Sequence, residues 1–332
     1  MSRRLAVGFI GCGGIARAHV DNLARLKRVE LKAFSDISID RAKALASTYG
    51  GEAYADWREM LEKSKLDLVF ICLPPFAHRD EVMVAAEKGI HIYIEKPIAL
   101  DIELAREMAR AVEKYGIKSQ VGYQLRFAAG VERAKRIIES GEAGAIGLVN
   151  GVYWCRFIRR DWWIDRSKSG GQIVEQSTHL YDILRWLCGD VERVYAEMDR
   201  RFYTDVKDMT IEDVSSVLMR FKSGAIGVVS STIGAAPGYW WLRWSIIGRD
   251  AMLESEDPNH LRIYWSGKTP FTIEEYREPS RAPMALAELD LVNAILEDRD
   301  TRTPISEGVK TLELTLAAVK SAETGKPVTL PL

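Results

Sequence analysis

Residues 5–16 read LAVGFIGCGGIA, an apolar run that breaks into a cluster of glycines. The run Leu5–Ile10 predicts a buried strand, and Gly11 permits the tight turn that leaves it. Gly13 lets the backbone approach a ligand closely, and a helix that begins there offers its first N–H groups to a phosphate. The pattern favours a dinucleotide pyrophosphate over an ordinary strand–helix turn. The residues expected to touch the pyrophosphate are Gly11, Gly13, Gly14 and Ile15.

This turn opens a segment in which strand-like and helix-like patterns alternate. A clear helix is expected between Asp101, a good N-cap, and Gly116, which suits the position after a helix end. Alternation of this kind predicts a parallel sheet with helices on both faces, here an N-terminal Rossmann dinucleotide-binding domain over residues 1–123. The strand-like runs are Leu5–Ile10, Val29–Phe34, Leu66–Leu73, Ile90–Ile94 and Ile117–Tyr123.

The pattern changes after about Tyr123. Apolar runs become long and rich in Val, Tyr and Trp, and Lys222-Ser223-Gly224 and Gly248-Arg249-Asp250 resemble hairpin turns between them. One helix is expected over Gln172–Cys188, and two more close the chain. The expected fold is therefore α/β, with residues 124–332 forming a C-terminal α+β domain around a large, mostly antiparallel open sheet.

The composition excludes several classes of partner. The chain has 332 residues and a formal net charge of -1, which is enough for two domains and gives no surplus charge to attract nucleic acid. Its four cysteines show no CxxC motif and no metal-ligand spacing with the five histidines, so we expect reduced thiols and no metal site. No apolar stretch approaches the ~20 residues of a membrane helix, and the first run is too short for an export signal. We therefore expect a cytoplasmic protein with no membrane partner.

Asp36 ends the second strand-like run. A carboxylate at this place accepts hydrogen bonds from the ribose hydroxyls of adenosine and repels a 2′-phosphate, which predicts NAD rather than NADP. Two structural alternatives are a turn residue after the strand and an N-cap for the helix expected around Asp40–Thr48. Lys32 and Arg41 lie close to it in the sequence and keep NADP as an alternative cofactor.

Two later strand ends also carry candidate cofactor residues. Consecutive prolines after Leu73 prevent a helix from starting, so this loop stays open at the carboxyl edge, where open α/β sheets bind ligands. His78 follows in the loop as a structural or cofactor-adjacent residue. Glu95-Lys96-Pro97 ends the next run, where a cis bond before the proline would aim the lysine into the cleft; the alternative is a surface salt bridge. The candidates at these strand ends are Leu73, Pro74, His78, Glu95 and Lys96.

Three ionisable residues recur within the helix expected over Gln172–Cys188. Glu175, His179 and Asp182 are spaced i, i+4 and i+7, which places them on one helical face. Aliphatic residues occupy roughly the opposite face, so this helix can bury one side and present the ionisable side to a cleft. The structural alternative is a partly buried histidine whose neighbouring carboxylates favour the helix dipole.

Together these motifs resemble the Gfo/Idh/MocA oxidoreductases, the family of glucose–fructose oxidoreductase and inositol dehydrogenase. The resemblance spans essentially the whole chain. It implies an NAD(P)-dependent enzyme with a dinucleotide-binding domain and a second domain whose open sheet serves substrate binding and oligomerisation, typically as a homodimer or homotetramer. The motifs that carry it are Gly11–Ala16, Asp36, Glu95-Lys96-Pro97, residues 170–182 and residues 323–328.

The resemblance also implies roles for individual residues. Lys96 and His179 match the family's catalytic lysine and histidine, and Asp182 matches a substrate-contacting acid. Glu175 stands where most members have aspartate, so its partner, Lys96 or His179, and the substrate can differ. Oxidation of a secondary alcohol needs a base for the hydroxyl proton, which suits His179, and a donor to the same oxygen, which suits Lys96.

Aromatic residues give weaker hints about the substrate. Eight of the nine tryptophans fall after residue 150, and Trp163 precedes charged residues that could bind hydroxyls. Indole faces stack on the C–H face of a sugar or cyclitol, but sheet and interface packing is an equal alternative. Gln124 and Arg126 could reach the cleft or serve the domain junction, and Arg126 would suit an acidic or phosphorylated substrate.

The leading hypothesis is thus a dehydrogenase of a sugar, sugar derivative or cyclitol. A second hypothesis retains NAD through both half-reactions, as in a sugar–sugar oxidoreductase or a redox-assisted glycosidase. A third is a non-enzymatic dinucleotide-binding regulator, which the presence of both Lys96 and His179 disfavours.

Overall fold

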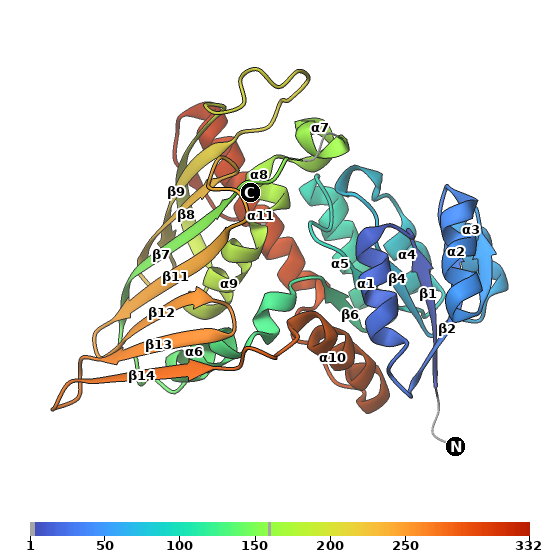
Figure 1. The fold of residues 1–332 in the computed structure, drawn as a ribbon, viewed down its shortest axis with the longest axis horizontal. Helices are drawn as coiled ribbons and strands as arrows, with labels where there is room; N and C mark the ends of the chain where they lie inside the picture. The colour runs from blue at the N-terminus through green and yellow to red at the C-terminus, as the bar shows by residue number, and fades with distance from the viewer. Residues whose placement is uncertain (1–3, 159–160) are drawn as a thin grey trace. The chain divides into compact units, whose positions relative to one another are not determined.

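The computed structural model describes residues 4–158 and 161–332. The chain divides into two compact units, whose elements are labelled in Figure 1. Unit 1 comprises Met1–Gln124 and Pro283–Val309, and unit 2 comprises Leu125–Ala282 and Lys310–Leu332. The first division falls next to the boundary expected between residues 123 and 124. The return of Pro283–Val309 to unit 1 was not anticipated.

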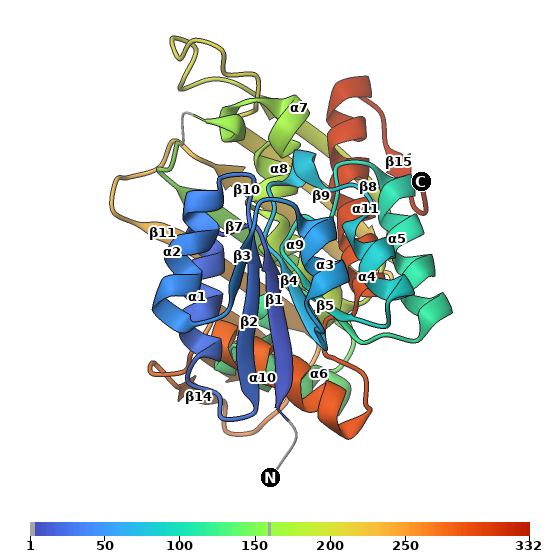
Figure 2. The same cartoon turned by 90° about the vertical axis from the view of Figure 1, so that its right-hand side faces the viewer.

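Unit 1 is built on a six-stranded sheet in the order β3-β2-β1-β4-β5-β6, with every pair parallel. Helices α1 and α2 lie on one face, and α3, α4 and α5 lie on the other (Figure 2). This confirms the expected Rossmann architecture. The strands are β1 (Leu5–Ile10), β2 (Val29–Ser35), β3 (Glu52–Tyr54), β4 (Leu68–Ile71), β5 (His91–Ile94) and β6 (Ser119–Val121). The helices are α1 (Gly14–Leu23), α2 (Ile39–Tyr49), α3 (Trp57–Lys63), α4 (Glu81–Glu87) and α5 (Ile102–Tyr115).

Local signals fix several of these elements. The side chain of Asp101 accepts hydrogen bonds from the backbone N–H groups of Glu103 and Leu104, and α5 ends at Gly116 in the left-handed conformation (φ 64°). Both ends of this helix were expected from the sequence, because these residues satisfy the groups that a helix terminus leaves unpaired.

The returning segment completes unit 1. Helix α10 (Pro283–Glu297) packs beside α1, and its Leu291 and Val292 join the buried core of the sheet. Beyond it, the carbonyl of Thr303 accepts a hydrogen bond from the backbone N–H of Val121 (2.8 Å), which pairs the free edge of β6. Pairing of this edge and burial of an apolar helix face explain why the segment belongs to unit 1.

Unit 2 is built on a nine-stranded sheet in the order β14-β13-β12-β11-β7-β10-β9-β8-β15. All neighbours are antiparallel except β10 and β7, which confirms the mostly antiparallel sheet. Its strands are β7 (Ile146–Cys155), β8 (Val191–Asp199), β9 (Val214–Phe221), β10 (Ile226–Thr232), β11 (Trp240–Gly248), β12 (Met252–Asp257), β13 (His260–Trp265), β14 (Thr272–Arg277) and β15 (Val328–Thr329).

The helices of unit 2 cover only one face of this sheet. Helices α6 (Ala129–Glu139), α9 (Thr178–Cys188) and α11 (Ile305–Thr324) lie along that face, as Figure 1 shows. The strands alternate between buried residues beneath these helices and more exposed residues on the opposite face, as in β9. In the described part of the chain no helix covers that opposite face.

The structure also describes the cysteines, the side chains that could bind a metal ion and the helices that could cross a membrane. All four cysteines are free and buried. Within residues 4–158 and 161–332 there is no cluster of three or more His, Cys, Asp or Glu side chains arranged for a metal ion. A search of the same residues finds no helix with the length and apolar character needed to cross a membrane.

Candidate functional site

The glycine turn at the end of β1 has the geometry of a phosphate cradle. Gly11 has φ +88°, and a Cβ placed there would lie 2.4 Å from the carbonyl oxygen of Cys72, so only glycine fits. A Cβ on Gly13 or Gly14 would meet nothing within 4 Å, and no side chain caps the start of α1. The first N–H groups of α1 are therefore open to an anion, and the exposed Ile15 flanks them. These residues fit a dinucleotide pyrophosphate.

Asp36 follows β2 and is held by the same turn. Its Oδ2 accepts a hydrogen bond from the backbone N–H of Cys12 (2.8 Å), and its Oδ1 accepts one from the N–H of Ser38 (2.8 Å). The half-exposed guanidinium of Arg41 also donates to Oδ1, with Nη2 at 2.9 Å. Asp36 thus lies beside the glycine turn and pairs with Arg41, the residue that kept NADP as an alternative. Its contact with the ribose stays a prediction.

The proline loop after β4 keeps Leu73 and Pro74 partly exposed at the carboxyl edge of the sheet. A short 3₁₀ helix, Pro75–Ala77, replaces the α-helix that the prolines exclude. His78 is fully buried, and its Nδ1 lies 2.6 Å from Oε1 of Glu81. Of the two roles expected for His78, this geometry favours the structural one, because the ring has no exposed surface for a cofactor.

Lys96 lies at the same edge, directly after β5. The Lys96–Pro97 peptide is cis, as the sequence analysis allowed, and the lysine side chain is partly exposed. Glu95 does not point toward solvent: its Oε1 lies 3.0 Å from Nε2 of His19, a fully buried residue of α1. The structure therefore places Lys96 at the carboxyl edge of the sheet, with β4 between its strand and β1, and it gives Glu95 a partner that no sequence motif indicated.

In unit 2 the helix expected over Gln172–Cys188 is broken. Helix α8 (Gln172–Glu175) ends before α9 begins at Thr178. The N–H of Ser177 reaches back to the carbonyl of Gln172 (3.0 Å), an i→i−5 bond typical of a π turn. The expected continuous face with Glu175, His179 and Asp182 was therefore wrong, because the break changes the helical phase between Glu175 and the two residues on α9.

The Glu175 carboxylate is held by Trp163. Indole Nε1 donates to Oε2 at 2.7 Å, and the indole itself is 2% exposed, with its ring edge-on to Phe157. Trp163 was expected to stack on substrate, but a ring buried to this extent has little face to offer. It fixes one oxygen of Glu175. The expected contact of this carboxylate with Lys96 or His179 stays a prediction.

Asp182 and Arg126 form a buried ion pair. Arg126 donates from Nε to Oδ2 (2.8 Å) and from Nη2 to Oδ1 (2.6 Å), and each side chain is only 1% exposed. The hydroxyl of Thr311 on α11 also donates to Oδ1 (3.0 Å). Substrate contact was expected of both Arg126 and Asp182, but their bidentate pairing uses these charges inside unit 2. Gln124 begins the 3₁₀ helix Gln124–Phe127 and is partly exposed.

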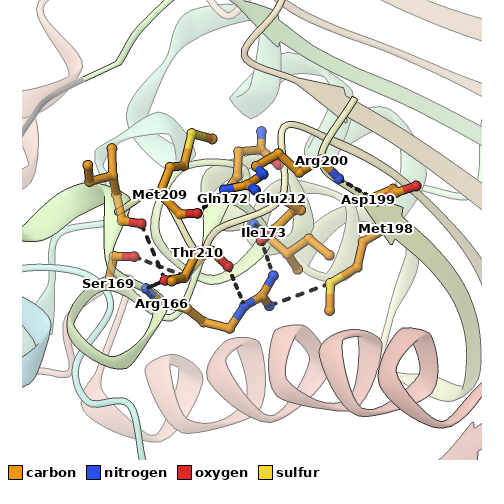
Figure 3. A network of polar contacts seen from close by, with 12 residues as sticks. Arg166, Ser169, Gln172, Ile173, Met198, Asp199, Arg200, Met209, Thr210 and Glu212 are labelled. Carbon is orange, nitrogen blue, oxygen red and sulfur yellow. Dashed lines mark hydrogen bonds and ion pairs between the residues drawn. The ribbon is translucent and has the colours of Figure 1, made fainter. Parts of the chain in front are cut away.

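The start of α8 is anchored by the carboxylate of Glu212, which no sequence motif indicated. Figure 3 shows Glu212 among the polar contacts that join α7 (Arg166–Ser169) to α8. Its Oε1 accepts the N–H of Ile173 (2.8 Å), and its Oε2 accepts Nη2 of Arg166 (2.9 Å). Burial raises the pKa of Glu212, and the nearby Arg166 opposes that rise. A Cβ on Gly171 (φ +92°) would lie 2.5 Å from Oε2, so glycine is required beside this carboxylate.

Most tryptophans of unit 2 pack in or on the sheet. Trp244 and Trp265 are buried in its core, whereas Trp154 and Trp241 are register partners on the face that lacks helices. Trp240 is half-exposed and contacts the edge of Tyr153. Of the two alternatives for these residues, the observed positions favour packing.

An open glycine cradle, an acidic residue after β2 and a lysine after β5 define a dinucleotide-binding redox unit. Residues 5–123 match the model described as the oxidoreductase family with an NAD-binding Rossmann fold, and residues 131–254 match the GFO/IDH/MocA C-terminal domain. The chain belongs to the GFO/IDH/MocA family. It is an NAD-binding oxidoreductase, which confirms the enzyme class and the cofactor expected from the sequence.

Individual relatives resemble the chain over its whole length. It is 28% identical over 344 residues to the uncharacterized oxidoreductase YrbE of Bacillus subtilis, covering 99% of this chain and 98% of the relative. It is 27% identical over 346 residues to scyllo-inositol 2-dehydrogenase (NAD(+)) of the same organism, covering 99% and 97%. Levoglucosan dehydrogenase in complex with NADH and L-sorbose has the same fold, with a TM-score of 0.92, 22% identity and 99% of each chain covered.

Proposed function

We propose that this enzyme is an NAD-dependent dehydrogenase that oxidises a secondary alcohol of a sugar, sugar derivative or cyclitol. The observation that carries the proposal is the open pyrophosphate cradle after β1 together with Lys96 after β5, both at the carboxyl edge of the unit 1 sheet. The relative named scyllo-inositol 2-dehydrogenase supports the substrate class.

We assign each candidate residue a role in binding NAD or in moving the proton. Gly13 and Gly14 hold the pyrophosphate through backbone N–H groups, and Asp36 binds the adenosine ribose. NAD, when bound, supplies the hydride acceptor. His179 takes the hydroxyl proton, and Lys96 donates a hydrogen bond to the same oxygen as negative charge develops on it.

We assign a positioning role to Glu175 and to the buried residues that hold it and α9 in place. Glu175 lies in the segment just before His179, and its hydrogen bond from Trp163 fixes one carboxylate oxygen. The buried ion pair between Arg126 and Asp182 fixes α9 within unit 2. In this proposal Trp163, Arg126 and Asp182 set the orientation of the substrate-facing groups and do not themselves stack on or neutralise the substrate.

The test is a screen of polyols, aldoses, inositols and sugar acids with NAD, followed by the absorbance of free NADH. Accumulation of NADH with one of these substrates supports a dehydrogenase. Turnover without free NADH would instead favour the alternative in which NAD is retained through both half-reactions. Lys96→Ala and His179→Ala should each lower kcat by ~10²–10⁴ while NAD still binds. Near-normal kcat in both variants would contradict the assigned roles.

The proposal includes assembly of a homodimer or homotetramer through the uncovered sheet face of unit 2. Register places Ile226 beside Leu148, and Leu218 beside Val228. The exposed fractions of Leu148, Leu218 and Ile226 are 40%, 49% and 39%. Contiguous apolar side chains of this kind mark interaction surfaces.

Light scattering tests the assembly. Leu218→Lys with Ile226→Lys should shift the protein toward monomer, because two buried lysines would face the partner copy. Leu289→Lys, which changes an exposed leucine on α10, is the matched control and should leave the mass unchanged. An unchanged mass in the double variant would argue against this face.

A further inference from the structure

A fully buried histidine joins three elements of unit 1. The ring of His19 on α1 lies between Glu95 after β5 and Glu288 on α10. Nδ1 is 2.6 Å from Oε1 of Glu288, and Nε2 is 3.0 Å from Oε1 of Glu95. The exposed fractions of the His19, Glu95 and Glu288 side chains are 0%, 11% and 1%.

The contacts of this ring favour an imidazole that carries two protons. Each nitrogen faces a carboxylate oxygen, and only an imidazolium can donate from both nitrogens at once. Burial opposes the charge, but the hydrogen bonds to Glu288 and Glu95 outweigh it and raise the pKa of His19 to about 9. Burial raises the pKa of Glu288, and its hydrogen bond with His19 opposes that rise.

Among the described residues, the aromatic side chains that pack against the ring carry no charge near neutral pH. Phe70 and Tyr93 pack against it, with the Tyr93 ring edge-on at 4.8 Å between centroids. Burial raises the pKa of Tyr93 well above its ordinary value, and it does the same for the Cys72 thiol at the end of β4. Asn22 on α1 is a polar neighbour of the pair and donates to Oε1 of Glu288 at 3.2 Å.

The Glu95 carboxylate, in turn, has little freedom to move. A Cβ added to Gly122 would lie 2.7 Å from its Oε1, so the carboxylate packs directly on the backbone after β6. Its Oε2 accepts the backbone N–H of Lys96 at 3.3 Å. The position of Glu95 is therefore coupled to the peptide that carries Lys96.

We propose that His19 is a positioning residue whose imidazolium holds Glu95, and through it the strand end that presents Lys96. This inference rests on the proposed function, in which Lys96 contacts the reacting oxygen. Loss of the His19 proton would leave two buried carboxylates facing a neutral ring, and their repulsion would disturb the Lys96 segment.

The first test is direct and needs no activity. In the full chain labelled with ¹³C-histidine, the His19 resonance, assigned with His19→Gln, should titrate near pH 9. Glu288→Gln should move its midpoint to lower pH by about one unit or more, because one carboxylate acceptor is lost. A midpoint near the ordinary value of about 6.5 in the unaltered protein would overturn the proposal.

The second test is the pH profile of turnover. The alkaline loss of kcat should move to lower pH in Glu288→Gln, in step with the His19 resonance, while Kd for NAD near neutral pH stays within about twofold. Glu297→Gln, an exposed change on the same helix, is the matched control. A profile that does not move while the resonance does would refute the link between His19 and Lys96. Failure of every alcohol in the unaltered enzyme would reject the proposed function and leave the resonance test standing.

Discussion

The indole N–H of Trp163 donates a hydrogen bond to the Glu175 carboxylate, with 2.7 Å between Nε1 and Oε2. The two residues lie on different short elements, the 3₁₀ helix Trp162–Ile164 and α8. This hydrogen bond therefore connects the 3₁₀ helix to the segment that precedes His179.

Trp163→Phe removes this bond and keeps most of the ring. We expect kcat to fall by roughly tenfold, because Glu175 loses the donor that fixes its orientation, while Kd for NAD is unchanged. Trp265→Phe, which alters a buried indole in the nine-stranded sheet, is the control. A larger effect on substrate KM than on kcat would instead support direct stacking of Trp163 on the substrate.

Asp36→Ser should change cofactor preference. The variant loses the negative charge that repels a 2′-phosphate and releases the Arg41 guanidinium from its ion pair. We expect Kd for NADP to fall by roughly tenfold and Kd for NAD to rise, which a fluorescence titration measures. Adding Arg41→Leu should reverse the gain for NADP. Unchanged preference in Asp36→Ser would show that another residue reads the ribose.

Arg126→Leu should destabilise the protein by about 3–5 kcal/mol, because Asp182 would remain buried without its charge partner. Chemical denaturation measures the free energy of unfolding. The double variant with Asp182→Leu should recover part of the loss. Arg262→Leu, which breaks an exposed ion pair with Glu275, is the control and should cost less than about 1 kcal/mol. Normal stability of Arg126→Leu would contradict a structural pair.

Glu212→Ala should weaken the start of α8. It leaves the N–H of Ile173 without its acceptor, and a four-residue helix cannot hold its position alone. We expect a loss of about 1–3 kcal/mol in unfolding free energy and a lower kcat. Glu212→Gln keeps an acceptor oxygen and should lose less. Equal behaviour of the two variants would show that the ion pair with Arg166 matters more than the backbone contact.

Stability should fall at alkaline pH because of His19. Its pKa is raised from about 6.5 to about 9 in the folded protein, so its contribution is complete below pH 6.5 and is lost as pH rises through about 9. The loss is at most about 3 kcal/mol. Denaturation curves at about pH 6 and about pH 9.5 measure it, and His19→Gln should flatten the difference. The same alkaline loss in His19→Gln would assign the effect to another group.

Sequence patterns that span only a few residues predicted several elements of the fold. The turn at Gly11 depends on a positive φ, and both ends of α5 depend on capping partners no more than three residues away. The apolar runs of unit 1 predicted a parallel sheet because strands buried on both faces leave a continuous apolar signal.

Partners far apart in the chain could not be predicted in this way. His19 and Glu288 are 269 residues apart, and Arg126 and Asp182 are 56 apart. Helical periodicity shows on which face of a helix a residue lies. It does not show which charged side chain from a distant segment will contact that residue. A histidine in the helix after a glycine turn, aligned on one face with the buried Ala16 and Leu23, was the available signal for His19.

The sequence by itself therefore determined the fold class, the glycine cradle and the strand end that carries Lys96, because short-range sterics and apolar periodicity specify them. Only the tertiary structure decided which carboxylates are buried and paired, where the helix before His179 breaks, and that residues 283–309 return to unit 1. These features depend on desolvation and on contacts between distant segments, which have no counterpart in local sequence spacing.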